Sequence, residues 1–133
     1  MDFEELGVSH DEVLGEFYFQ PLNSDEDVVG FFTCVMTLSE EVYEETLARL
    51  YEAISVLNFY IPNGAFGVSK DMGAITYRVC LVYPLTTEKD ALFDLANAAM
   101  GNTLTLLDRW VDIVLRISEG KGDVRDIESA LGL

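Results

Sequence analysis

Few side chains in this chain of 133 residues have the chemistry of a catalytic acid, base or nucleophile. His10 is the single histidine, and it stands in an acidic segment beside Asp11 and Glu12. A nucleophilic site would require His10 to meet Cys34 or Cys80, but both cysteines fall inside apolar strand patterns and lack CxxC spacing. The sequence therefore predicts a solvated histidine, two reduced thiols packed as small apolar groups, and no enzymatic activity.

Carboxylates gather in three places where a metal ion would find oxygen ligands. The acidic turn at 23–27, Asn-Ser-Asp-Glu-Asp, has oxygen donors for a hard cation such as calcium but lacks the spacing of an EF-hand loop. The pairs Asp108/Asp112 and Glu41/Glu45 stand four residues apart in predicted helices, with no histidine beside them. No glycine-rich loop leads into a helix, as phosphate binding requires. We therefore expect polar faces at these positions, and no bound metal, nucleotide or other cofactor.

Charge argues against several classes of partner. The chain has 24 Asp and Glu residues against eight Lys and Arg, which gives a formal net charge of -16. Such a surface is repelled by the phosphates of nucleic acids and by anionic membranes, so we expect neither as a partner. The same charge attracts basic segments of other proteins, although a well-solvated surface is the simpler interpretation.

Composition and length indicate one folded domain. Half of the residues are hydrophobic (50%), including eight Phe and six Tyr, which argues against disorder despite the charge. A chain of this length buries a core without disulfides or metals, so residues 1–133 are expected to form a single domain. The first residues, MDFEELGVSHDEV, are acidic where a signal peptide needs a basic start, and no apolar run is long enough to span a membrane. We therefore expect a cytoplasmic protein.

The clearest structural signal is a hairpin at residues 64–84. A turn signal at 70–73 separates a short apolar stretch from a long alternating strand. One face of that strand is expected to lie under helices, and it consists of Ile75, Tyr77, Val79, Leu81 and Tyr83. The opposite face is too apolar for a fully solvated surface, and it consists of Thr76, Arg78, Cys80 and Val82.

Two strands are expected before the hairpin. Residues 15–22 alternate phenylalanines with polar side chains, and residues 28–38 are apolar on both faces. One face of the second strand carries Phe32, Cys34, Met36 and Leu38, and the other carries Val29, Phe31, Thr33 and Val35. The N-terminal segment 1–14 is weakly patterned, and we expect a short acidic helix there, with Ser9 as its cap.

Capping signals predict three helices. The run Thr37-Leu38-Ser39-Glu40 matches a capping box before an amphipathic helix that buries Leu50, Ile54 and Leu57, with Ser39 as the alternative cap. Thr86 or Thr87 is expected to cap a long helix at 88–118, with a kink or a change of packing partner at Gly101-Asn102-Thr103. Asp123 is expected to cap a short helix within the C-terminal segment 123–133.

These elements predict an α+β fold of the order β-β-α-β-β-α. Strand pairs followed by helices are typical of an antiparallel sheet, here of about four to five strands, with the two main helices on one face. Most of the chain, from about Phe17 to Ile117, resembles the YbjN-like group within the type III secretion chaperone-like fold family. The resemblance is strongest in LNFYIPNGAFGV at 57–68 and GAITYR at 73–78.

Members of that fold have a first helix, a three-stranded segment, a helix, a hairpin and a final helix. The weakly patterned segment 1–14 and the two strands expected after it depart from this order at the start of the chain. The resemblance implies a homodimer that engages other proteins through exposed apolar grooves and carries out no catalysis.

The doubly apolar second strand suggests how such a protein would act. One layer of helices cannot cover both of its faces, so we expect the second face to bind a second subunit or a client protein, unless the N-terminal segment folds over it. The candidate interface consists of Val29, Phe31, Val35, Thr76, Arg78 and Val82. The alternative function is a small-ligand sensor with a pocket between the sheet and the long helix, near Gly101 and Trp110.

Overall fold

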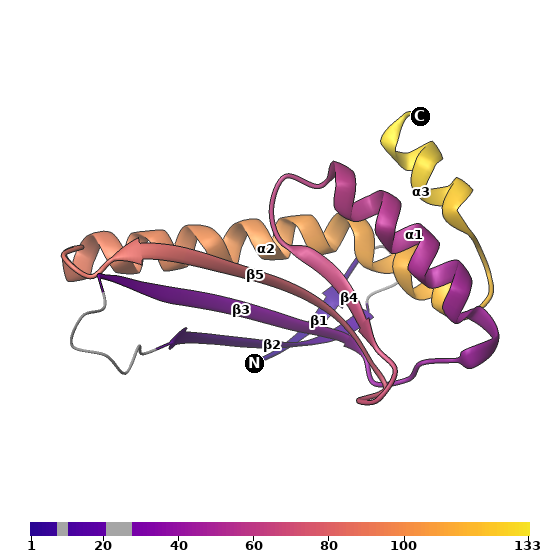
Figure 1. Cartoon of the computed structure of the whole chain (residues 1–133), viewed down its shortest axis with the longest axis horizontal. Coiled ribbons are helices and arrows are strands. Elements are labelled where there is room, and N and C mark those ends of the chain that lie inside the picture. Colours follow the sequence, from indigo (N-terminus) through magenta and orange to yellow (C-terminus); the bar gives the residue numbers. More distant parts are fainter. Residues whose placement is uncertain (8–10, 21–27) are drawn as a thin grey trace.

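The structure, a computed structural model, describes residues 1–7, 11–20 and 28–133. This part of the chain is an α+β fold, as predicted, with a five-stranded antiparallel sheet of order β1-β2-β3-β5-β4 and helices on one face (Figure 1). The strands are β1 (Asp2–Leu6), β2 (Asp11–Gln20), β3 (Val29–Ser39), β4 (Ala65–Ser69) and β5 (Ala74–Pro84). The helices are α1 (Leu47–Tyr60), α2 (Lys89–Ser118) and α3 (Val124–Leu131), with a 3-10 turn η1 at Glu44–Thr46.

The centre of the sheet is the pair β3 and β5. Their inner faces meet in register, with Phe32 opposite Leu81 and Met36 opposite Tyr77, and the predicted alternation places these side chains under the helices. Met36 and Tyr77 are fully buried, and the Tyr77 hydroxyl donates a 2.7 Å hydrogen bond to the carbonyl of Asn63. Burial raises the pKa of Tyr77, with a smaller contribution from the nearby Cys34. The predicted hairpin at 64–84 is confirmed as β4 and β5.

The N-terminal segment is a strand, so the predicted helix at 1–14 is wrong. β1 pairs with β2 through Phe3 opposite Val13, and the Phe3 ring packs edge-on against Phe17 at 6.0 Å. Val13 and Leu6 are buried, and this burial against the sheet overrides a weak helical pattern. Ser9, the predicted cap, lies outside the described residues. The predicted order of elements therefore omitted one strand.

The start of α1 differs from the predicted capping box. β3 continues to Ser39, whose hydroxyl accepts a 3.0 Å hydrogen bond from the backbone N–H of Glu41 in a local turn. The helix begins only after η1, and Thr46 donates its hydroxyl hydrogen to the carbonyl of Ser118, at 2.6 Å, instead of capping α1. The predicted apolar stripe is buried at Leu50, Ile54 and Leu57.

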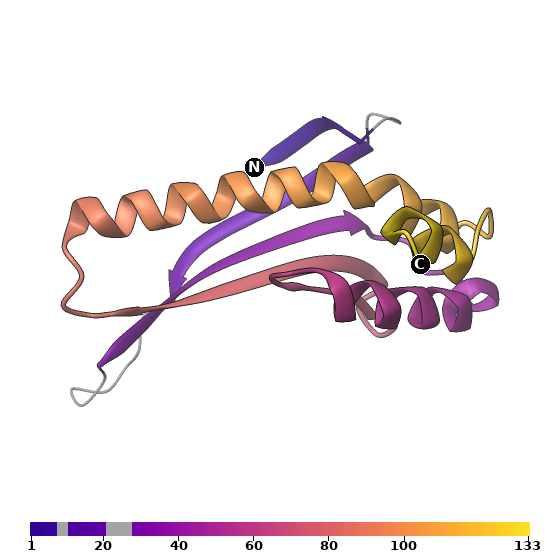
Figure 2. The ribbon, with the colours of Figure 1, turned by 90° about the horizontal axis from the view of Figure 1, so that it is seen from above.

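α2 is one uninterrupted helix, and Figure 2 shows it along its whole length. Its N-cap is Glu88, without a side-chain capping bond, so the predicted caps Thr86 and Thr87 are wrong. The helix continues through Gly101 without a break, while the buried Thr103 hydroxyl bonds to the carbonyl one turn earlier at 2.8 Å. The packing partners do change along it, because α1 and α3 lie beside its C-terminal half only (Figure 1).

α3 begins where its capping residue predicted. Asp123 accepts a 2.9 Å hydrogen bond from the backbone N–H of Arg125, and Asp126 accepts one from the backbone N–H of Asp123, which completes a capping box. Ile127 is the fully buried anchor of this helix. α3 packs against both α1 and α2, and so completes the helical layer at one end of the molecule.

Candidate functional site

The helices leave one face of the sheet uncovered in the described part of the chain, and we call it the outer face. It is formed by alternate residues of β2, β3 and β5, whose side chains point away from the helical layer. These residues are Leu14, Glu16, Tyr18, Gln20, Val29, Phe31, Thr33, Val35, Thr37, Thr76, Arg78, Cys80 and Val82. All six residues of the predicted interface belong to this face.

The strand register brings those six residues into one strip along β3 and β5. Phe31 stands opposite Val82 and Val35 stands opposite Arg78 as direct cross-strand neighbours. Thr76 lies one row beyond Arg78, and Val29 ends the strip at the start of β3. The predicted interface thus lies on two neighbouring strands, and the pair Thr33 and Cys80, which was not predicted, stands between its Phe31–Val82 and Val35–Arg78 pairs.

The outer face exposes apolar side chains among its polar and charged ones. Val82 is 59% exposed, and β2 adds Tyr18 at 43% and Leu14 at 37%, two residues that the sequence analysis missed. Thr33 is fully buried although it lies on this face, because it sits between its cross-strand neighbours Tyr18 and Cys80. A solvated face of an antiparallel sheet usually carries alternating polar residues, so this composition is typical of a surface that becomes covered.

Two opposite charges flank the apolar strip. Glu16 and Arg78 are the cross-strand neighbours of Val35 on its two sides, and both are exposed. Neither side chain forms a hydrogen bond or ion pair with another described residue. This central part of the outer face therefore carries one positive and one negative charge. A two-fold axis parallel to β3 would place Glu16 of one copy opposite Arg78 of a second copy.

The N-terminal segment does not cover the outer face where it is described. β1 extends the sheet beside β2, and the backbone N–H of Gly7 donates a 2.8 Å hydrogen bond to Asp108 of α2. This bond holds the end of β1 beside α2, on the helical side of the sheet. The alternative in which the first segment folds over the outer face is therefore wrong for residues 1–7.

The two cysteines differ in environment. Cys34 is fully buried under α2, and burial raises the pKa of its thiol. Cys80 is exposed on the outer face, so the prediction of a second core thiol is wrong. Its sulfur accepts a 3.5 Å hydrogen bond from the Thr33 hydroxyl, across the β3–β5 pair. Cys80 was misassigned because its strand neighbours are apolar, although its alternation with Val79 had placed it on the other face.

The groups with catalytic or metal-binding chemistry do not assemble into a site in the described part of the chain. There, no three His, Cys, Asp or Glu side chains are grouped so that they could hold a metal ion. His10 and the acidic turn 23–27 lie outside the described residues. Asp108 accepts a hydrogen bond from the backbone N–H of Gly7, just after β1. Glu41 accepts a hydrogen bond from the Tyr43 hydroxyl, and this bond raises the pKa of Tyr43.

A second accessible apolar surface lies between α1 and α3. A hollow of about 400 Å³, which we call the α1–α3 groove, is lined by Ser55, Val56, Phe59, Tyr60, Glu128 and Leu133. This groove was not predicted from the sequence. Its signal was present, because Phe59 and Tyr60 end an amphipathic helix and fall outside the buried stripe of Leu50, Ile54 and Leu57.

Gly101 and Trp110 do not form the pocket that was expected between the sheet and the long helix. Gly101 is exposed, and Trp110 is buried in the core with 3% of its surface accessible. A hollow of about 250 Å³ lies instead between α2 and α3, and its lining includes Arg116 and Ser129.

Comparisons with known proteins add no identification: no family model, no curated protein and no solved structure matches this chain. In the described part of the chain, none of the helices has both the length and the apolarity required to cross a membrane.

Proposed function

We propose that this chain is a non-enzymatic protein-interaction module, chaperone-like or regulatory, that forms a homodimer through the outer face of its sheet. The observation that carries the proposal is the strip of Phe31, Val35 and Val82 on a face that no described helix or terminal strand covers. Packing two such faces about 10 Å apart would bury the strip, as in a sandwich of two sheets. Glu16 and Arg78, on opposite sides of Val35, make the face complementary to itself about a two-fold axis parallel to β3.

The order of elements supports the same proposal. Three strands, a helix, a hairpin and a long helix follow one another here, and this is the order that the resemblance to the secretion chaperone-like family implies after its first helix. That resemblance implies dimers that bind other proteins. A dimer formed through the sheet would leave the helical layer free for such a partner.

Solution size tests the dimer. We expect the wild-type chain to sediment as a dimer of 14.8 kDa subunits, and Val82→Glu and Phe31→Glu to sediment as monomers with unchanged far-UV circular dichroism. Val82 is 59% exposed, so its substitution has little effect on the fold. Leu95→Glu adds the same charge at an exposed position of α2 and should remain dimeric. A wild-type monomer, or a Val82→Glu dimer of wild-type stability, would overturn the proposal.

A small-ligand sensor is the second candidate, and the hollow between α2 and α3 favours it. Three polar residues, Arg116, Asp126 and Ser129, line that hollow beside the apolar Ile113 and Ala130. Small-molecule sites combine apolar walls with a few polar groups in this way. Thermal stabilisation of the wild type by a pool of small metabolites, lost in Arg116→Ala, would support a sensor; an unchanged melting temperature would exclude it.

A further inference from the structure

The α1–α3 groove exposes more apolar surface than a solvated helix pair needs. Phe59 is 80% exposed, Leu133 is 64% exposed and Tyr60 is 49% exposed. The rings of Phe59 and Tyr60 meet edge-on at 5.0 Å, and both residues line the hollow together with the half-buried Val56. Because α1 buries its opposite side, around Leu57, in the core, these rings contribute little to the fold. Exposed aromatic rings beside a hollow are typical of a binding surface.

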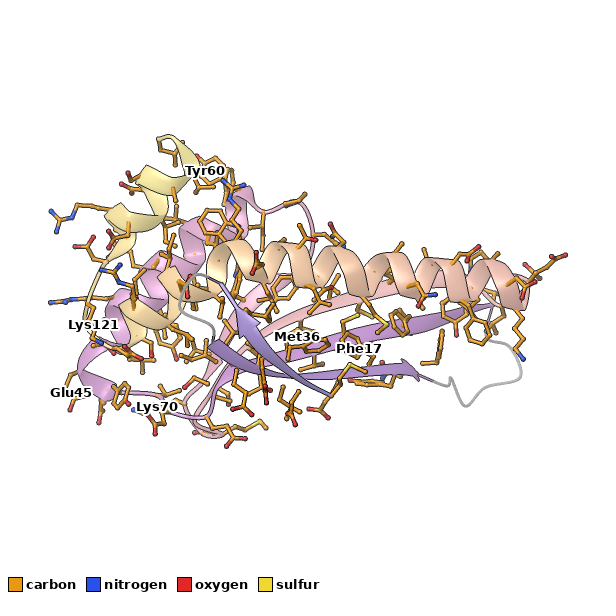
Figure 3. The ribbon with its side chains drawn as sticks, turned by 180° about the vertical axis from the view of Figure 1, so that it is seen from behind. Phe17, Met36, Glu45, Tyr60, Lys70 and Lys121 are labelled. Atoms are coloured by element: carbon orange, nitrogen blue, oxygen red, sulfur yellow. The ribbon has the colours of Figure 1, made fainter. Side chains whose placement is uncertain are left out.

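The same groove is electronegative. α1 and α3 run in the same direction, so their C-terminal ends, which carry partial negative charge, lie side by side (Figure 1). Neither helix has a basic residue of its own in its last turn, and among the described residues that line the groove the charged side chain is Glu128. The Arg109 guanidinium of α2 donates a 3.3 Å hydrogen bond to the carbonyl of Ala130, so it offsets part of the negative charge at the end of α3 but not at the end of α1. Lys121 lies at the opposite end of this helix pair from Tyr60 (Figure 3), and Arg125 is paired with Asp123 at 2.6 Å.

We propose that the α1–α3 groove binds a basic amphipathic helix of another protein. Its apolar side chains would fill the hollow against Phe59, Val56 and Leu133, in the manner of a helix bound in a groove. Its lysines or arginines would lie at the two helix ends and over the rings of Phe59 and Tyr60. A second copy of this chain is disfavoured as the occupant, because it would bring an equally electronegative groove to the contact. The inference rests on the proposed function and assigns its partner site.

A designed peptide provides the probe. We would use a peptide of about 18 leucine and lysine residues, with leucines at helical spacing, and a counterpart in which glutamate replaces lysine. The lysine peptide should bind and shift the backbone amide resonances of residues 55–60 and 128–133, and the glutamate peptide should not bind. Phe59→Ser should weaken binding by about tenfold or more. Phe93→Ser, at an exposed ring of α2 away from the groove, should leave the Kd within about twofold.

The inference is overturned if the lysine peptide does not bind. It is also overturned if the shifts spread over the whole acidic surface, or if Phe59→Ser and Phe93→Ser bind equally well. Phe59→Ser should retain the sedimentation behaviour of the wild type, because Phe59 belongs to α1, in the helical layer, and is not part of the outer face of the sheet. Dimer formation and groove binding are thus measured separately, and either can fail while the other succeeds.

Discussion

Asn58 protects an edge of the sheet, and its removal tests how the fold keeps that edge closed. β4 is the last strand of the sheet, so its outward backbone groups have no strand partner. The Asn58 side chain of α1 takes that place: its amide nitrogen donates to the carbonyl of Phe66 at 2.9 Å, and its amide oxygen accepts from the N–H of Phe66 at 2.8 Å. One side chain therefore satisfies both backbone groups of an edge residue.

In Asn58→Ala, loss of the two hydrogen bonds should lower the free energy of unfolding by about 2 kcal/mol, and the higher helix propensity of alanine should offset part of this loss. The estimate assigns about 1 kcal/mol to each of the two partly buried hydrogen bonds. Replacing Asn by Ala inside a helix returns up to about 0.7 kcal/mol. Asn102→Ala makes the same replacement at an exposed position of α2, so the difference between the two variants isolates the hydrogen bonds.

Urea unfolding followed by circular dichroism provides the measurement. With an m-value of about 2 kcal/mol per molar urea, a difference of 2 kcal/mol separates the two midpoints by about 1 M. Asn58→Asp keeps the acceptor for the Phe66 N–H but loses the donor to its carbonyl, so it should also be destabilised. Midpoints that coincide for Asn58→Ala and Asn102→Ala would refute the assignment of Asn58 as the edge cap.

Two further predictions concern groups that titrate or react. In the monomeric Val82→Glu variant, under native conditions, a thiol reagent at pH 8 should modify Cys80 quickly and Cys34 only after unfolding, because Cys34 is buried and burial raises the pKa of its thiol; equal rates would contradict this placement. Hydrogen bonds from Arg125 lower the pKa of Asp123 from 3.8 to about 2. The stabilisation that the Asp123 carboxylate gives to α3 is therefore complete above pH 4 and is lost as the pH falls toward 2. A carboxyl NMR titration should show a midpoint near 2 that rises in Arg125→Gln, and an unchanged midpoint in the variant would contradict this cause.

Elements with local signals could be predicted from the sequence. The inner face of β5 was evident because its apolar residues alternate with period two over the whole strand. α3 was evident because Asp123 makes its capping bonds within three residues of itself. The six residues of the predicted interface fall on one face for the same reason, since alternation fixes which side of a strand a residue occupies.

Elements that depend on distant contacts could not be predicted in this way. β1 is a short strand that is held by pairing with β2 and by the bond from Gly7 to Asp108, about a hundred positions away in sequence. Ser39 followed by acidic residues fits a helix cap and a strand-end turn equally well, and the length of β3 decided between them. The partial exposure of Tyr18 depends on which strand flanks β3, which the alternation alone does not specify.

Cross-linking through Cys80 tests the central claim most directly, because Cys80 is the accessible one of the two cysteines and lies on the outer face. A bismaleimide that spans the roughly 10 Å between packed sheets should join two wild-type chains in high yield at low protein concentration. The same reagent should leave Val82→Glu and Cys80→Ser as single chains. Wild-type chains that stay uncross-linked, with Cys80 modified once by the reagent, would show that the outer face is not the dimer interface.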